Sequence, residues 1–457
     1  MEKILSDILK DIEVLQVKGD TGRHIAGITF DSRQVVPGVV FAAVRGTQSD
    51  GHDYIDAALA SGASAIICEQ FPASFSGNAT LVRVKDSSLS LGILASSFYD
   101  HPSAKFKLVG ITGTNGKTTT ITLLHRLFTA LGYKSGCFTT IRNYIGNETV
   151  DATHTTPDPV QLNRIMKDMA ESGCKYVFMQ VSSHALAQQR VAGLRFAGAI
   201  FSNITHDHLD YHKTFDEYLK AKKLFFDNLS PASFALINTD DRNGKIIVQN
   251  TKATIHYYGI RSMADFKARI VESRVDGTLL NIDGIEIWTR FIGEFNAYNL
   301  LAVYSCACLL GQQKEEVLKV MSSLETVEGR FQYLQSPEGV TAVIDYAHTP
   351  DAIMNVLKTI GQINKGNGQV ITVIGAGGNR DRTKRPVMAQ VAADLSDKLI
   401  LTSDNPRNEE PEEIIRDMKA GLDDRQLAKT MIQPDRHEAI KTACMLAGKG
   451  DIILIAG

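Results

Sequence analysis

VGITGTNGKTTT, residues 109–120, is the stretch that decides the fold of this chain. The apolar run at 107–111 has the length and composition of a buried strand. Gly113 and Gly116 then mark a loop, and apolar residues recur at helical spacing after Lys117, so we expect a helix to begin there. A strand, a glycine loop and a helix in this order form a phosphate cradle, because freed backbone N–H groups and the positive helix end point at the anion.

The Gly-Lys-Thr junction gives this loop its chemistry. Lys117 would reach the terminal phosphates of a nucleotide, and Thr118 would hold Mg²⁺. The standard pattern has four residues between its first glycine and the Gly-Lys pair, whereas two residues separate Gly113 from Gly116 and five separate Gly110 from Gly116. A glycine-rich turn that binds nothing is the plainer interpretation, but a lysine followed by three threonines at a helix start has little packing rationale. We therefore interpret the stretch as a shortened phosphate loop.

Length and composition bound the class of protein. A chain of 457 residues predicts roughly two to four domains. Hydrophobic residues at 44% and charged residues at 22% are ordinary for a soluble protein, and a net charge of -2 argues against a molecule-wide nucleic-acid surface. The six cysteines are scattered, which indicates core thiols. With no signal peptide or membrane-length apolar run, we expect a cytoplasmic monomer that acts on small molecules, without nucleic-acid or membrane partners.

The first region, 1–103, reads as a small α/β unit. We expect strands at Ile25–Asp31, Val39–Val44 and Ala65–Cys68, and a helix at His52–Ser61. Asp100–Ser103 breaks the pattern and predicts a linker. No residue spacing in this region predicts catalysis.

The second region, 104–329, alternates strands with helices, which favours a mainly parallel sheet covered on both faces. Ligands of such sheets bind at the carboxyl ends of the strands. Three polar clusters follow predicted strands, at His154–Pro157, Ser182–His184 and Asn203–His212. The last of them includes His206, Asp207, His208, Asp210 and His212, a density that suits a metal or phosphate site. Solvated loop residues that cap the next helix are the plainer interpretation.

The third region, 330–457, repeats the alternation and predicts a second doubly wound unit. Its strand-end loops are Asp345–Pro350, Gly375–Arg385 and Ser403–Asn408. The middle loop, GAGGNRDRTKR, combines four basic residues with three glycines. A solvated basic turn is the plainer interpretation, and an anion site facing the phosphate loop is the sharper one.

The whole chain resembles the Mur ligase family of ATP-dependent amino-acid ligases, which act in peptidoglycan synthesis. The resemblance rests on the motifs GTNGKT, DSRxVxPGxxF, HTTP, VSSHAL, DHLDYH, GxFNxYN, GRF, DYAHTPD, GGNRDRxKRP and DNPR. It implies three domains: a small N-terminal α/β domain, a central P-loop ATPase-type parallel sheet, and a C-terminal Rossmann-like doubly wound domain. Among family members, those that add the third residue of the stem peptide are most similar.

The resemblance also implies roles for individual residues. ATP would be bound by Gly113, Thr114, Asn115, Gly116, Lys117, Thr118, Thr119, Asn296, Asn299 and Asp345. The UDP-muramoyl dipeptide would be bound by Phe30, Ser32, Thr47, Gln48, Ser49, Thr155, Thr156, Ser182, Gln188 and Arg190. The incoming amino acid would be bound by Arg385, Asp404, Asn405, Pro406, Arg407 and Gly457. Catalytic residues would be Lys117, Lys222, His208 and Arg330, and Mg²⁺ ligands Thr118, Gln180, His208 and a carbamylated Lys222.

The activity implied is addition of meso-diaminopimelate to the D-Glu γ-carboxylate of UDP-N-acetylmuramoyl-L-Ala-D-Glu, with ATP and Mg²⁺ and through an acyl phosphate. Arg407 favours diaminopimelate over lysine, because a guanidinium pairs with the second carboxylate that lysine lacks; an arginine that caps the helix near Pro411 is the plainer interpretation. Gln180 stands where the family usually has Glu. The family also usually continues past Gly457, so we expect this chain to be shortened at its end.

Three alternatives stay open at this point. A lysine-adding ligase would share the mechanism. A related amide ligase such as folylpolyglutamate synthase is disfavoured by DSRxVxPG and DNPR. A catalytically weakened homologue that binds the UDP-muramoyl peptide in a regulatory role is kept open by Gln180.

Overall fold

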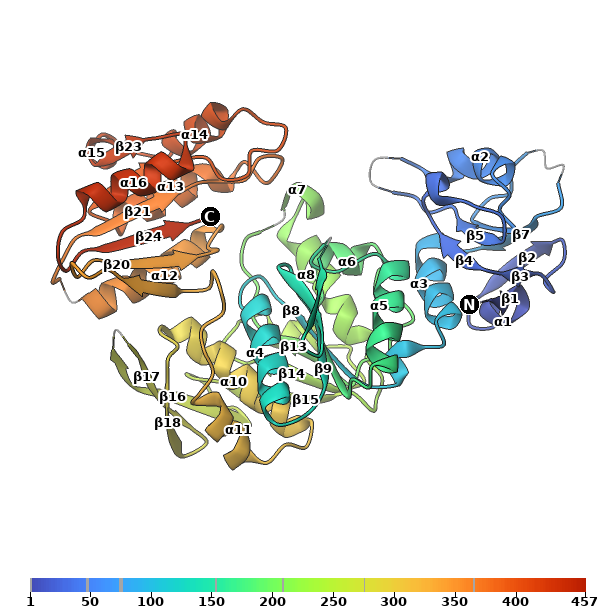
Figure 1. The fold of residues 1–457 in the computed structure, drawn as a ribbon, viewed down its shortest axis with the longest axis horizontal. Coiled ribbons are helices and arrows are strands. Elements are labelled where there is room, and N and C mark those ends of the chain that lie inside the picture. The colour runs from blue at the N-terminus through green and yellow to red at the C-terminus, as the bar shows by residue number, and fades with distance from the viewer. Residues whose placement is uncertain are drawn as a thin grey trace.

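Three large sheets organise this computed structural model, which describes residues 2–46, 49–73, 77–152, 154–207, 209–274, 276–364 and 366–457. The sheets follow one another along the chain and each carries its own helices (Figure 1). Thr47, Gln48 and His208, for which binding roles are predicted, lie outside the described residues. The predicted α/β class with three domains is confirmed by this arrangement.

The N-terminal sheet has the order β2-β7-β6-β5-β4, with β2 antiparallel to β7 and the other pairs parallel. The predicted strand 25–31 is interrupted: β3 and β4 are separate and belong to different sheets. The predicted helix at 52–61 is shorter, because a 3₁₀ turn occupies its first half. The elements are β1 Lys3–Ile4, α1 Leu5–Leu9, β2 Val14–Lys18, β3 His24–Ile25, β4 Gly27–Thr29, η1 Ser32–Gln34, β5 Val39–Ala42, η2 Gly51–Tyr54, α2 Ile55–Ala60, β6 Ala65–Cys68, β7 Thr80–Val84, α3 Ser87–Phe98 and η3 Pro102–Ala104.

The central sheet has eleven strands in the order β11-β10-β9-β12-β8-β13-β14-β15-β16-β17-β18. Strand β8, which precedes the phosphate loop, lies in its middle. The elements are β8 Lys107–Thr112, α4 Lys117–Ala130, β9 Ser135–Phe138, β10 Arg142–Ile145, β11 Glu148–Asp151, α5 Pro159–Glu171, β12 Tyr176–Gln180, α6 Ser183–Ala187, β13 Gly198–Phe201, α7 Leu209–His212, α8 Phe215–Asp227, β14 Phe234–Asn238, α9 Gly244–Ile247, β15 Thr254–Gly259, β16 Phe266–Arg274, β17 Gly277–Ile282, β18 Ile285–Thr289, α10 Glu294–Leu309 and α11 Lys314–Met321.

Both ends of this sheet differ from the parallel sheet that the sequence predicts. Strands β10 and β11 form an antiparallel hairpin at one edge, and β16, β17 and β18 form an antiparallel meander at the other. The strand β16 is largely exposed, so its sequence lacks the continuous apolar run that marks a buried parallel strand. The parallel centre is confirmed, and it is packed on both faces: α4, α10 and α11 cover one core and α5 and α8 the other.

The C-terminal sheet has the order β19-β20-β24-β21-β22-β23, and all its pairs except β19 with β20 are parallel. This confirms the predicted doubly wound unit. The elements are β19 Gln332–Gln335, β20 Thr341–Asp345, α12 Pro350–Asn364, β21 Val370–Ile374, α13 Lys384–Asp394, β22 Lys398–Leu401, α14 Pro411–Lys419, α15 Asp424–Ala428, β23 Thr430–Ile432, α16 Arg436–Leu446 and β24 Ile452–Ala456.

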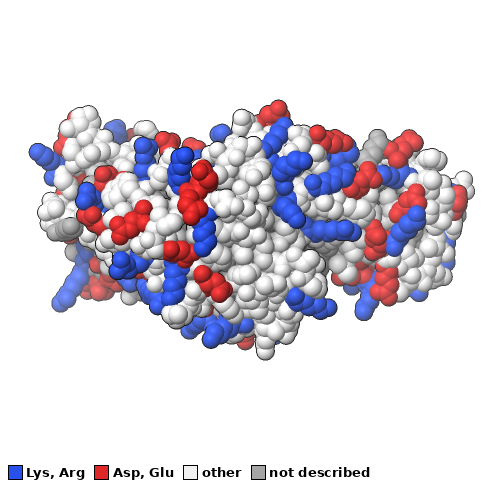
Figure 2. All heavy atoms as spheres, turned by 90° about the horizontal axis from the view of Figure 1, so that it is seen from below, with Lys and Arg blue, Asp and Glu red and all other residues white. Residues whose placement is uncertain are grey.

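The C-terminal sheet turns the carboxyl end of a strand toward the central region (Figure 1). The carboxyl end of β24, where the described chain ends, lies on the side of the C-terminal sheet that faces the central region, near α7 (Figure 1). On the face seen in Figure 2, basic and acidic side chains are interspersed, with no single sign dominating. Within the described part of the chain, no helix has the length and apolar character that crossing a membrane requires.

Candidate active site

A cleft of about 860 Å³ opens between the central and C-terminal sheets. Its size is that of a ligand site. It is lined by residues from the phosphate loop, from α10, and from the strand-end loops of the C-terminal sheet. Among predicted site residues, those on its wall are Thr114, Asn115, Gly116, Lys117, Thr118, Thr119, Thr155, Gln180, Ser182, Asn296, Asn299, Arg330, Asp345, Asp404, Arg407 and Gly457.

The phosphate loop joins β8 to α4 and contains two glycines at positions where neighbouring atoms leave no room for a side chain. A Cβ on Gly116, whose φ is +87°, would lie 2.4 Å from Asn299 Oδ1, and one on Gly113 would lie 2.0 Å from Ser202 Oγ. The amides of Thr114 and Asn115 already donate to Asn203, at 2.8 and 2.9 Å. The first amides of α4 therefore remain the backbone donors that a phosphate would meet.

Two lysine ammonium groups converge on one backbone carbonyl of this loop. Lys117 Nζ lies 2.9 Å and Lys222 Nζ 2.8 Å from the Gly113 carbonyl oxygen. Burial lowers the pKa of Lys117 to about 8, opposed by Asp207. Burial, reinforced by Lys117, also lowers the pKa of Lys222 well below its ordinary value. Burial and mutual repulsion disfavour charge on both lysines, so a bound anion would stabilise their charged forms.

The Thr118 hydroxyl stands at the centre of a small polar network. Arg330 Nη2 donates to Thr118 Oγ1 at 3.0 Å, and Gln180 Nε2 donates to the same oxygen at 3.1 Å. Arg330 Nε is buried without a hydrogen-bond partner among the described residues, and the guanidinium stacks on Tyr346 at 4.5 Å. An orphaned guanidinium N–H beside a phosphate loop is a donor for a phosphate oxygen.

Asn296 and Asn299 line the cleft from the first turns of α10. Asn299 Nδ2 donates to Asn296 Oδ1 at 3.2 Å, and Asn296 donates to the Ile292 carbonyl at 2.9 Å. Asp345 ends β20 and accepts from the Phe331 amide at 2.7 Å. Burial raises the pKa of Asp345 to about 6, partly offset by Arg330.

The predicted dipeptide-binding residues are divided between two places. Thr155 and Ser182 line the cleft, whereas Thr156 lies behind them and donates to the Gln180 carbonyl at 2.9 Å. Arg190 donates to Gln188 Oε1 at 2.6 Å and to the Thr156 carbonyl at 2.8 Å. It therefore connects the segment after α6 to the loop that carries Thr155 and Thr156.

The predicted uridine-binding residues lie on the N-terminal domain. Phe30 is 41% exposed and directly follows β4, Ser32 begins η1, and Ser49 is exposed. None of the three is among the described residues that line the cleft.

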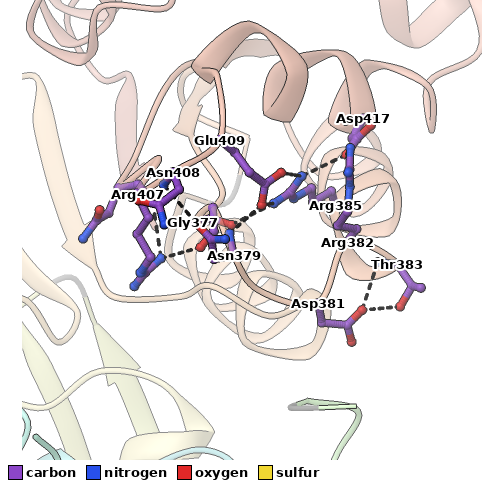
Figure 3. Close-up of polar contacts among 12 residues, drawn as sticks. Gly377, Asn379, Asp381, Arg382, Thr383, Arg385, Arg407, Asn408, Glu409 and Asp417 are labelled. Atoms are coloured by element: carbon purple, nitrogen blue, oxygen red, sulfur yellow. Dashed lines mark hydrogen bonds and ion pairs between the residues drawn. The ribbon is translucent and has the colours of Figure 1, made fainter. Parts of the chain in front are cut away.

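The C-terminal loops bring Arg407, Asp404 and Gly457 to the cleft wall. Arg407 has a left-handed backbone, with φ of +53°, and its Nη1 donates to the Gly378 carbonyl at 2.7 Å (Figure 3). Asn405 and Pro406 hold the loop itself: the Asn405 carbonyl accepts from the Gly378 amide at 2.8 Å.

Arg385 has a different environment from the one predicted. Its side chain is completely buried, and its guanidinium binds both oxygens of Glu409 at 2.8 Å, Asp417 at 2.9 Å and the Gly377 carbonyl at 3.1 Å (Figure 3). Although burial opposes it, these partners raise the pKa of Arg385. Nη1 and Nη2 are therefore occupied by protein groups and clamp two loops together, whereas Nε is buried without a hydrogen-bond partner among the described residues. A completely buried guanidinium held in this way does not face the cleft, so its role is to support the loops.

The predicted histidine and aspartate cluster is also divided. His206 and Asp207 face the C-terminal domain, whereas His212 is buried against Tyr211 and Tyr218. Burial lowers the pKa of His212 to about 4. Among the described residues, no group of three or more histidine, cysteine, aspartate or glutamate side chains is placed to hold a metal. The described members of the cluster thus do not form a metal site by themselves.

Several cleft residues were not singled out from the sequence. Asp351, at the start of α12, accepts from Asn115 Nδ2 at 3.0 Å. His348, Arg380 and Lys384 line the C-terminal side, and Tyr298 lines the central side. His348 and Asp351 lie in DYAHTPD, and Arg380 and Lys384 lie in GGNRDRxKRP, so the motifs marked these loops without ranking their residues.

Three family models match consecutive parts of the chain. A model of the Mur ligase family, catalytic domain, matches residues 24–99, one of the Mur ligase middle domain matches 111–307, and one of the Mur ligase, glutamate ligase domain matches 329–457.

Named proteins are similar over almost the full length. A Bacteroides thetaiotaomicron protein called UDP-N-acetylmuramoyl-L-alanyl-D-glutamate--2,6-diaminopimelate ligase is 54% identical over 454 residues, which cover 99% of this chain and 94% of that protein. A solved structure of a ligase with the same name is 30% identical with a TM-score of 0.69, covering 100% of this chain and 93% of the other. Thermotoga maritima MurF ligase in complex with ADP shares the fold at 20% identity and a TM-score of 0.64, covering 94% and 93%.

Proposed function

The chain belongs to the Mur ligase family, and we propose that it joins 2,6-diaminopimelate by an amide bond to UDP-N-acetylmuramoyl-L-alanyl-D-glutamate, using ATP. The observation that carries this proposal is the cleft that brings the phosphate loop and Arg407 to one wall. We also propose a cytoplasmic location, and the monomeric state stays a prediction.

The first step activates a carboxylate. We propose that the D-Glu γ-carboxylate oxygen attacks the γ-phosphorus of ATP, forming an acyl phosphate, while the bond to the bridging oxygen breaks and ADP leaves. Lys117, Arg330 and the α4 amides would stabilise charge on the transferred group, because they converge at the Thr118 end of the cleft.

The second step forms the amide. The uncharged amine of diaminopimelate attacks the acyl carbon, a C–N bond forms, the C–O bond to phosphate breaks, and phosphate leaves with that oxygen. The proton that the nitrogen loses passes to the departing phosphate, which leaves as hydrogen phosphate. Arg407 would bind the distal carboxylate of diaminopimelate, because a guanidinium can donate two parallel hydrogen bonds to a carboxylate. L-Lysine has no second carboxylate and could not form this contact. Positioning of two substrates in one cleft supplies most of the acceleration.

Magnesium is the cofactor that the family implies. Thr118 Oγ1 and Gln180 Oε1 lie 3.4 Å apart, and both are oxygen donors of the kind that Mg²⁺ binds. Both are uncharged, so these residues fit an ion held largely by nucleotide phosphates, with His208 and a carbamylated Lys222 as further proposed ligands. The ion, when bound, neutralises phosphate charge. Lys222 suits carbamylation because burial favours its neutral amine.

An isotope experiment tests this mechanism. UDP-N-acetylmuramoyl-L-Ala-D-Glu labelled with ¹⁸O in the γ-carboxylate is incubated with ATP, Mg²⁺ and diaminopimelate, and phosphate and nucleotide product are measured by mass spectrometry. The acyl phosphate predicts one ¹⁸O in each phosphate released and a tripeptide product. Phosphate without label, alongside a tripeptide, would contradict the mechanism; no tripeptide would contradict the function.

A further inference from the structure

The central and C-terminal domains meet through a buried ion pair and an adjacent contact between a histidine and an aspartate. Lys384 Nζ lies 3.4 Å from Asp207 Oδ1, with the two side chains 8% and 4% exposed. His206 Nε2 lies 3.2 Å from Asp381 Oδ2. A histidine and an aspartate on the loop after β13 thus face an aspartate on the loop after β21 and a lysine at the start of α13.

The same contact reaches the nucleotide site. Asp207 and Lys384 both line the cleft, and Asn115, within the phosphate loop, donates to Asp351 of α12 at 3.0 Å. The loop of His206 and Asp207 is tied to the phosphate loop as well, because Asn203 accepts from the Thr114 amide at 2.8 Å. Closure of the two domains and the shape of the phosphate loop therefore share one set of contacts.

The other side of the contact leads to the predicted amino-acid site. Lys384 begins α13, and its neighbour Arg385 holds Glu409 and the Gly377 carbonyl. The Asn379 amide donates to Glu409, and Arg407 donates to the Gly378 carbonyl at 2.7 Å (Figure 3). Lys384 and the guanidinium of Arg407 are thereby connected through one continuous set of hydrogen bonds.

We propose that the pairs Asp207–Lys384 and His206–Asp381 form an interdomain latch, whose residues position the Arg407 loop over the phosphate loop for amide formation. This inference rests on the proposed function for its role in catalysis. Asp207 and Lys384 come from different domains, so domain separation returns both charges to water, whereas closure buries them together. Removing one charge makes closure bury the other without this partner, which disfavours the closed state.

A double-mutant cycle tests the latch in the full chain. The variants are Asp207→Asn, Lys384→Met and the two combined, and the matched control is Asp227→Asn. Asp227 pairs with Lys223 at 2.6 Å within α8, and the two side chains are 24% and 12% exposed. The control substitution therefore removes a lysine–aspartate pair that lies within one domain. Measurements are kcat and KM for diaminopimelate, ATP affinity by calorimetry, thermal unfolding, and the radius of gyration by X-ray scattering.

The latch predicts that each single variant lowers kcat/KM for diaminopimelate about tenfold and increases the radius of gyration. ATP affinity should also fall in Asp207→Asn, because Asp207 supports the charge of Lys117 in the phosphate loop. The kcat/KM of the combined variant should be no lower than that of the less active single variant. The Asp227→Asn control should have the kcat/KM of wild type. If one single variant does not fold, the other tests the same pair from the opposite domain.

Unchanged compactness and kinetics in the folded single variants would overturn the latch, as would strictly multiplicative losses in the combined variant. If wild type does not turn over diaminopimelate, the proposed function fails, and scattering alone decides the latch: expansion of the single variants supports it, and an unchanged radius of gyration overturns it.

Discussion

The phosphate loop and the C-terminal Arg407 region both gather cations at the cleft, but they hold them differently. Lys117 and Lys222 bind backbone carbonyl oxygens of their own domain, and burial lowers the pKa of each. Arg385 binds the carboxylates of Glu409 and Asp417, which raise its pKa. In the first region an incoming anion would favour the charged forms of the lysines, whereas in the second region carboxylates already neutralise the cation and build a scaffold. Clustered basic residues alone do not distinguish these roles; the partners do.

Loss of a lysine from the first region should have the largest effect. Lys117→Ala removes an ammonium group from the proposed phosphate site, and we expect turnover to fall by about a thousandfold or more. Phosphate release measures it. Lys223→Ala, which removes a neighbouring lysine held by Asp227, should retain wild-type turnover. Undiminished turnover in Lys117→Ala would show that this region is not the phosphate site.

Loss of the scaffold should instead reduce stability. Glu409→Gln leaves the completely buried Arg385 without its bidentate carboxylate, and we expect the free energy of unfolding to fall by about 3 kcal/mol. Denaturant titration measures it. Glu413→Gln, which breaks an exposed pair with Arg416, should change stability by about 0.5 kcal/mol or less. Equal stability of the two variants would remove the contrast between a scaffold pair and a surface pair.

The pairing of Glu409 with Arg385 should also make stability depend on pH. Hydrogen bonds from Arg385, opposed by burial, lower the pKa of Glu409 to about 2 from an ordinary value of 4.5. The depressed value means that Glu409 contributes stability fully above pH 4.5, and that the contribution is lost as pH falls toward 2. Thermal unfolding at several pH values should show a steeper acid decline for wild type than for Glu409→Gln. Parallel declines would contradict this assignment.

Arg407 belongs to the loops that the Arg385 clamp supports, and it also lines the cleft. Arg407→Lys keeps the charge but loses the bidentate geometry, so we expect KM for diaminopimelate to rise about tenfold with ATP affinity unchanged. Steady-state kinetics measure both quantities. A KM equal to that of wild type would mean that another group binds the distal carboxylate.

Gln180 should give the smallest effect. Gln180→Glu adds a carboxylate beside Thr118, and we expect the Mg²⁺ concentration for half-maximal activity to fall several-fold. A magnesium titration measures it. No shift, with turnover retained, would indicate that the ion is held without this side chain.

The sequence predicted local features well and partner-dependent ones poorly. The strand at 107–112 and the helix from Lys117 follow from contiguous apolar spacing, and both are confirmed. The pairing of Arg385 with Glu409 spans 24 positions and two loops, so no local pattern contains it. The antiparallel meander β16–β18 was missed for a related reason, since the pairing of its strands defines it and β16 is largely exposed.

The most direct test of the proposed ligase activity is the amino-acid dependence of phosphate release. The protein is assayed with ATP, Mg²⁺ and UDP-N-acetylmuramoyl-L-Ala-D-Glu, together with meso-diaminopimelate, with L-lysine, or with neither. We predict release that requires diaminopimelate. Release that requires lysine would contradict the role of Arg407, and no release with either amino acid, while ATP still binds, would contradict the ligase activity itself.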